Sequence, residues 1–306
     1  MALAARDAAR VWDLRGRVLH EESELALYKA VDLCTDTSGA SWLAAGGRST
    51  AYGPTVVVRR IGGGAATVLP VAPGEDGAVG AVALGVGVGQ AVQVFAADNR
   101  HVRRWDAESA AALPPLHVPN DMVRHLAFVA SPTGRPFLLA GAGDTVWLWD
   151  AQEPGAPVPL RSPERAPVRA LAGTHDDDGR RHVAVATGKG VFVARPAARE
   201  AAAGAVELRP LSRTVVAVRS LACRSLPGNR VVVLAADASH VLHLWDVHED
   251  LRTSGIPDRG FAVHQVMAQR EPEGTGLVVA SVGLERMDVL TVSPPGGTAS
   301  RRTLPD

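Results

Sequence analysis

The sequence predicts an all-β protein built from repeated four-stranded units. One phrase of the form Val-Arg-x-Leu-Ala recurs through the chain, and a Trp-Asp pair follows it at a nearly constant distance. Val79 is followed in this way by Asp106, Val123 by Asp150 and Val218 by Asp246. Two periodic patterns that stay in phase indicate a single supersecondary unit repeated along the chain.

The clearest unit shows the four strands. Short runs rich in apolar and β-branched residues alternate with Gly, Pro and Asp, which are typical of turns between strands. The predicted strands cover Val123–Ala130, Phe137–Ala140, Thr145–Trp149 and Val158–Leu160, with turns at Ser131–Gly134 and Gly141–Asp144. Helical periodicity over eleven or more residues is hard to find anywhere in the chain.

The repeated phrase occurs six times. Its copies begin at Tyr28, Val79, Val123, Val168, Val218 and Val263. Their spacing is close to the period of about 40–50 residues that is typical of four-stranded repeat units. We therefore place complete repeats with starts near residues 25, 77, 121, 166, 215 and 261. A shorter unit over residues 1–21 precedes them, with a strand at Leu3–Ala5 and its own Trp-Asp pair.

These features resemble the WD40 repeat family. The run from Val123 to Gly134 is similar to the first strand and turn of that family, and a terminal Trp-Asp is its second mark. The resemblance implies a seven-bladed β-propeller that forms one domain over residues 1–306, with one blade lacking its innermost strand. The structural repeat marks are Trp12, Asp13, Trp105, Asp106, Trp149, Asp150, Trp245 and Asp246.

The chain departs from the family pattern in two respects. The Gly-His pair that commonly precedes the first strand is absent, and Trp-Asp is replaced near residues 59–60, 194–195 and 289–290. We therefore expect an incomplete version of the family's hydrogen-bond network. The short N-terminal unit has two interpretations: the chain is a piece of a longer protein, or its open strand edge accepts a strand from a partner or a second copy.

Composition and charge narrow the function. The chain has 32 basic and 32 acidic residues, which argues against a protein that neutralises many nucleic-acid phosphates. The longest uncharged stretch, residues 77–97, contains several glycines and alternates like strands, so we expect no membrane span. The first ten residues carry charges at Arg6, Asp7 and Arg10, unlike a signal peptide. We expect a cytoplasmic, monomeric protein of bacterial origin.

The second position of the repeated phrase supplies candidate binding residues. It is occupied by Lys29, Gly80, Arg124, Arg169, Arg219 and His264. The resemblance implies that the first strand of each blade lines a central channel, so five of these side chains would form a basic ring at its mouth. Such a ring could bind a phosphate, a carboxylate or an acidic peptide. Alternatively, the cations pair with acidic neighbours or extend into solvent.

Other candidate residues have structural interpretations. His175 and His182 flank three aspartates, but a surface Asp-Gly hairpin turn accounts for this segment and its spacing matches no known metal site. His240 and His243 are expected to be packed or solvated, and Cys34 and Cys223 to be buried structural thiols. The sequence predicts no metal site and no cofactor.

Motifs typical of enzymes are absent. The chain has no Gly-rich phosphate loop before a helix, no Gly-x-Ser-x-Gly and no His-Glu-x-x-His. We therefore expect no catalytic residues. The predicted function is a non-catalytic scaffold or sensor that binds a protein or peptide partner, as the WD40 region of a larger bacterial signalling protein would. The alternatives are a channel-mouth binder of small anions and a propeller enzyme acting on a small ligand.

Overall fold

The computed structural model contains β-strands and their connections. It describes the residues 2–4, 8–12, 18–71, 79–87, 90–98, 100–119, 122–131, 135–151, 155–162, 164–196, 206–213, 215, 217–247, 252–256, 265–270, 277–282, 287–292 and 300–304. Within these ranges there is no α-helix, so the predicted all-β class is confirmed. None of these residues belongs to a helix that could cross a membrane.

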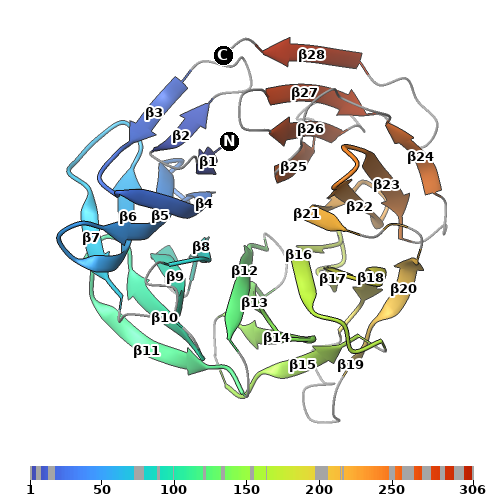
Figure 1. Cartoon of the computed structure of the whole chain (residues 1–306), viewed down its shortest axis with the longest axis horizontal. Coiled ribbons are helices and arrows are strands. Elements are labelled where there is room, and N and C mark those ends of the chain that lie inside the picture. Colours follow the sequence, from blue (N-terminus) through green and yellow to red (C-terminus); the bar gives the residue numbers. More distant parts are fainter. Residues whose placement is uncertain are drawn as a thin grey trace. The chain divides into compact units, whose positions relative to one another are not determined.

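The strands form seven small sheets in the described residues, each named here after its first strand (Figure 1). The β1 sheet contains β1 (Ala2–Ala4), β2 (Ala9–Trp12) and β3 (Val18–Glu22). The β4 sheet contains β4 (Leu27–Thr35), β5 (Ser41–Ser49), β6 (Gly53–Arg60) and β7 (Thr67–Pro70). The β8 sheet contains β8 (Val82–Val86), β9 (Val92–Asp98), β10 (His101–Asp106) and β11 (Ala112–His117).

The other four sheets continue the series. The β12 sheet contains β12 (Val123–Val129), β13 (Phe137–Ala142), β14 (Thr145–Asp150), β15 (Val158–Arg161) and β19 (Val206–Glu207). The β16 sheet contains β16 (Val168–His175), β17 (Arg181–Thr187), β18 (Gly190–Ala194) and β20 (Arg209–Ser212). The β21 sheet contains β21 (Val218–Leu226), β22 (Arg230–Asp237), β23 (Leu242–Asp246) and β24 (Arg252–Ile256). The β25 sheet contains β25 (Gln265–Arg270), β26 (Leu277–Val282), β27 (Met287–Val292) and β28 (Ser300–Leu304).

Consecutive strands pair antiparallel in most of these sheets, as short turns require. The one parallel pair in the described residues joins β15 to β19, with Leu160 opposite Val206. Strand β19 lies in the segment between β18 and β20, and the repeat pattern did not predict it. It adds a fifth strand at the edge of the β12 sheet. In the β1 sheet, β1 covers Ala2–Ala4 where a strand over Leu3–Ala5 was expected.

The chain divides into two compact units. The first comprises Met1–Ala130, Pro136–Gly143 and Trp147–Pro157, and the second comprises Ser131–Arg135, Asp144–Val146 and Val158–Asp306. The arrangement as one propeller domain stays a prediction.

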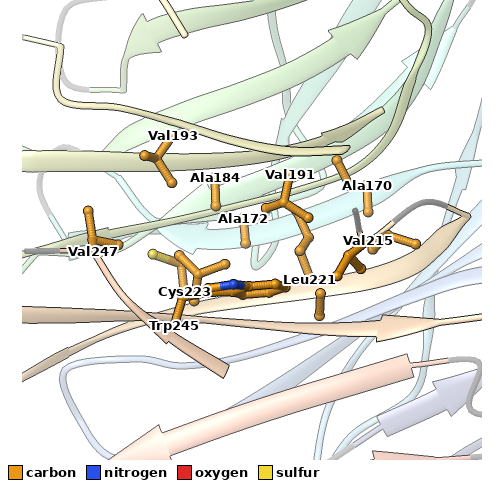
Figure 2. Packing of buried hydrophobic residues seen from close by; sticks show 14 of the residues in the cluster. Ala170, Ala172, Ala184, Val191, Val193, Val215, Leu221, Cys223, Trp245 and Val247 are labelled. Atoms are coloured by element: carbon orange, nitrogen blue, oxygen red, sulfur yellow. The ribbon is translucent and has the colours of Figure 1, made fainter. Parts of the chain in front are cut away.

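The core lies between neighbouring sheets. In the second unit, Trp245 of β23 is 1% exposed and packs with Leu221 and Cys223 against Ala172 and Val191 of the β16 sheet (Figure 2). The small residues Ala170, Ala172, Ala184 and Ala186 line the opposing sheet and leave room for the indole. One large aromatic residue thus packs against several small ones, which fills the space between two twisted sheets.

The equivalent tryptophans of the first unit occupy the same kind of position. Trp105 packs with residues of the β4 sheet, including Val56 and Leu69, and Trp149 packs with Phe95 of the β8 sheet. They are 7% and 2% exposed. The side chain of Trp12, and Asp13 entirely, lie outside the described residues.

Candidate functional site

Among the described residues, a β-bulge occurs in the first strand of four sheets, in each case at the second residue of the repeated phrase. The register of β4 shifts between Tyr28 and Ala30, and the same shift occurs in β12, β16 and β21. The extra residue in each bulge is a cation: Lys29, Arg124, Arg169 or Arg219. A bulge inserts one residue and redirects its side chain, so the four repeats present the same position of the strand in the same way.

Burial alternates sharply at each bulge. The residue before the cation is buried in all four strands, whereas the cation itself is exposed. Val168 and Val218 thus hold the strand to the core, and the next side chain leaves it. The sequence pair Val-Arg therefore marks the place where a buried side chain is followed by an exposed one.

The bulge in β4 brings two backbone segments unusually close. A Cβ atom at Gly47, which lies opposite Tyr28, would stand 1.8 Å from the carbonyl oxygen of Leu27. Only glycine fits there without moving the backbone. The backbone geometry of the bulge that carries Lys29 therefore requires glycine at position 47.

The four bulge cations lack protein partners in the part of the chain that the structure describes. No hydrogen bond or ion pair joins any of the side chains of Lys29, Arg124, Arg169 and Arg219 to a described residue. The predicted alternative of pairing with acidic neighbours is therefore not seen among these residues. Their guanidinium and ammonium groups face solvent.

The arrangement of the cations can be followed within each unit. In the second unit, Arg169 and Arg219 occupy the same position on β16 and β21, which pack directly against each other (Figure 1). In the first unit, the equivalent residue before β8 is Gly80, which is exposed and has open space around its Cβ position. His264 lies outside the described residues. A basic ring formed by all the repeats stays a prediction.

In the part of the chain that the structure describes, three hairpins carry a second repeated feature that sequence reasoning missed. In each hairpin, Oδ1 of an aspartate accepts hydrogen bonds from the backbone N–H groups of the second and fourth residues after it. Oδ2 of the same aspartate accepts a hydrogen bond from the side-chain ring N–H of the sixth residue after it. The aspartates are Asp36, Asp176 and Asp237, and the ring donors are Trp42, His182 and His243. We call these the Asp-anchored hairpins. The spacing Asp-x5-Trp or Asp-x5-His is the signal that could have identified them.

The Asp-anchored hairpins hold their carboxylates in the ionised form. Ser38 and Trp42 donate to Asp36 and lower its pKa to about 2. Burial opposes ionisation of Asp176 and Asp237, but the hydrogen bonds from His182 and His243 and from backbone N–H groups outweigh it, so both pKa values lie below the usual range.

The segment from His175 to His182 is thereby explained as a turn. Asp176 Oδ2 accepts from His182 at 3.0 Å, and the Nε2 atom of His175 contacts the carbonyl oxygen of Arg135 at 3.0 Å. Gly179 adopts a φ of 74°, which suits the turn. Among the described residues, no group of three or more His, Cys, Asp or Glu side chains could hold a metal ion.

Two of the Trp-Asp aspartates, Asp106 and Asp246, have different partners. Asp106 accepts from the hydroxyl and N–H of Ser109, which lowers its pKa and closes a turn. Asp246 forms an ion pair with Arg230, with 2.7 Å between Nη2 and Oδ2. The incomplete hydrogen-bond network that the departures from the family pattern predict stays a prediction.

Both cysteines are unsuited to act as nucleophiles. Burial raises the pKa of Cys34 and of Cys223 to about 12, and in each case the thiol stays protonated. Cys223 is 1% exposed and belongs to the core around Trp245.

Arg104 contrasts with the bulge cations. It is 8% exposed, its Nη2 donates to Gln93 Oε1 at 3.1 Å, and its guanidinium carbon lies 5.9 Å from the ring centre of Phe95. Burial lowers the pKa of Arg104. No carboxylate of a described residue pairs with it.

Comparison with known proteins adds no relative. No model of a known protein family matches the chain, and no curated protein matches it.

Proposed function

We propose that this chain is a WD40-like β-propeller that acts as a non-catalytic interaction module and binds an acidic segment of a partner protein. The two repeated phrases, kept in phase along the chain, support the architecture, as do the small sheets, five of which have four strands in chain order among the described residues. A monomeric, cytoplasmic protein, or a region of a larger bacterial signalling protein, belongs to the same proposal.

One observation carries the binding function. Four repeats place a cation at the extra residue of a β-bulge, where it is exposed and lacks a partner among the described residues. Arginine binds carboxylates through two parallel N–H···O bonds, and the strands fix the backbone position from which each of these side chains extends. A row of glutamates or aspartates in an extended peptide matches such a series of separate cations better than a single small anion does.

The experiment measures binding of a fluorescently labelled peptide of eight glutamates by anisotropy. The variant Arg124→Ala/Arg169→Ala/Arg219→Ala should weaken binding at least about tenfold, because each arginine supplies charge-assisted hydrogen bonds. A matched control, Arg60→Ala/Arg161→Ala/Arg270→Ala, removes three exposed arginines away from the bulges and changes the net charge equally. It should leave binding nearly unchanged.

The outcomes separate the interpretations. Equal losses in both variants would show that only net charge matters and would overturn the proposal. Competition by inorganic phosphate at the same concentration as the peptide would favour a binder of small anions instead. A melting temperature lowered in the bulge variant alone would assign these arginines a structural role.

A further inference from the structure

Two histidines face each other at the outer edge of the β8 sheet. His101 begins β10 and His117 ends β11, and the register pairs them directly. Both side chains are exposed, and neither has a hydrogen bond or ion pair with a described residue. Strand β11 is an edge strand, so solvent reaches the pair.

The backbone fixes the pair in the closer of the two antiparallel geometries. The N–H of Val118 donates to the carbonyl oxygen of Arg100 at 2.7 Å, which places the hydrogen bond outside the pair His101–His117. Such non-hydrogen-bonded pairs hold their Cα atoms about 4.5 Å apart, and the side chains point to the same face. The two imidazoles are therefore brought together by the strands and not by flexible loops.

The ring separation suits a shared metal ion. The ring centres lie 5.2 Å apart and the ring planes are inclined by 51°. A tetrahedral ion about 2.0–2.1 Å from one nitrogen of each imidazole would set the two ring centres about 5 Å apart. Stacked packing would instead bring the ring planes close to parallel, as between His243 and Trp245, which are inclined by 18°.

The charges around the pair allow a cation. Arg103 lies two residues after His101 on the same face of β10, but its Nε donates to Asp98 Oδ2 at 2.7 Å. Asp98 stands opposite His101 on β9. The Asp98 carboxylate thus offsets the charge of Arg103, and Arg100 is exposed to water.

We propose that His101 and His117 bind one divalent transition-metal cation of the zinc class, with water completing its coordination. Imidazole is a preferred ligand of Zn²⁺, Ni²⁺ and Cu²⁺, and two rings on rigid strands chelate the ion together. The site is separate from the bulge cations and does not depend on the proposed interaction function.

The test titrates the purified chain with Ni²⁺ and with Zn²⁺ by calorimetry. We compare wild type with His101→Gln, His117→Gln, the double variant and His240→Asn, a control at a histidine elsewhere in the chain. Each single variant should weaken binding at least about tenfold, because it removes the chelate effect. The double variant should be little weaker than either single one, since one ring alone holds the ion only weakly. The control should match wild type.

Melting without metal provides the folding check. In a chelating buffer, all variants should have the melting temperature of wild type. Added Zn²⁺ should raise the melting temperature of wild type and of the control only. Unchanged binding in both single variants would overturn the proposal. So would two small losses that add in the double variant, because separate weak sites behave in that way.

Discussion

The bulge cations and the Asp-anchored hairpins are both polar features that recur from sheet to sheet, but their surroundings differ. Lys29, Arg124, Arg169 and Arg219 are exposed and have no partner among the described residues. Asp176 is 3% exposed and Asp237 is 9% exposed. Each of these aspartates accepts three hydrogen bonds from its own hairpin.

This difference shows how recurrence should be interpreted in a repeat protein. A buried carboxylate must have its acceptors filled locally, because an unpaired buried charge costs several kcal/mol, about 3–5 when one partner is removed. An exposed arginine has no such requirement, and it is free to bind another molecule. Repetition alone does not separate structure from function, whereas the state of the hydrogen-bonding groups does.

The largest effect on stability is expected from Gly47→Ala, which places a methyl group at the close backbone approach beside the β4 bulge. The new methyl would overlap the carbonyl oxygen of Leu27, and backbone atoms cannot move aside easily. We expect a loss of about 3 kcal/mol or more in the free energy of unfolding, measured by urea denaturation. The control is Gly80→Ala, whose Cβ position is open, and it should change stability by less than about 0.5 kcal/mol. A loss for Gly47→Ala as small as that expected for Gly80→Ala would show that the close approach at Gly47 relaxes without cost.

Asp176→Ala should have the next largest effect on stability, because it removes the carboxylate that accepts the hydrogen bonds of an Asp-anchored hairpin. His182 loses its acceptor, and the N–H groups of Asp178 and Arg180 lose theirs. We expect the midpoint of urea unfolding to shift by an amount equivalent to about 2–3 kcal/mol. The exposed Glu108→Ala is the matched removal of a carboxylate and should leave the midpoint in place. A wild-type midpoint for Asp176→Ala would show that water replaces the carboxylate.

Much of the fold could be predicted from the sequence because strand and turn chemistry repeats locally. The predicted strands 123–130, 137–140, 145–149 and 158–160 correspond to β12 to β15. Strand β19 could not be predicted, because it is very short and pairs with β15 across the whole of β16, β17 and β18. No local pattern records such a contact.

The candidate site was predictable to the same degree. The recurrence of a cation after valine identified the positions, whereas the bulge that exposes them depends on register. The Asp-anchored hairpins follow a local spacing and could have been found. The pair His101 and His117 could not, since the two residues stand at the far ends of a hairpin and only the pairing of β10 with β11 joins them.

Acid should reduce the contribution of the Asp-anchored hairpins to stability and leave that of the bulge cations unchanged. The pKa values of Asp36, Asp176 and Asp237 are lowered in the folded chain. Their contribution to stability is therefore complete above the pKa of an unfolded aspartate, about 3.9, and is lost as the pH falls through the folded values, which for Asp36 is about 2.

The measurement is the melting temperature of wild type and Asp237→Asn between pH 7 and pH 2. The variant should melt lower than wild type at pH 7, and the gap should narrow on acidification because protonation removes the same charge from wild type. The bulge variant Arg124→Ala/Arg169→Ala/Arg219→Ala should follow the wild-type profile throughout. A constant gap for Asp237→Asn would mean that its carboxylate is not stabilised by the hairpin.

The smallest effect on stability, and the sharpest test of the bulge positions, is expected from Gly80→Arg. Gly80 occupies the position of the bulge cations in the repeated phrase, it is exposed, and nothing lies within 4 Å of its Cβ position. An arginine there should leave the melting temperature within about 1 °C of wild type, because surface substitutions away from packed groups change stability little. If the bulge cations bind acidic segments, it should also tighten binding of the eight-glutamate peptide severalfold. The control Gly63→Arg adds the same charge at another open glycine. An equal gain in both would show that charge alone governs affinity, whereas a gain at Gly80 alone would identify the repeat position as the binding position.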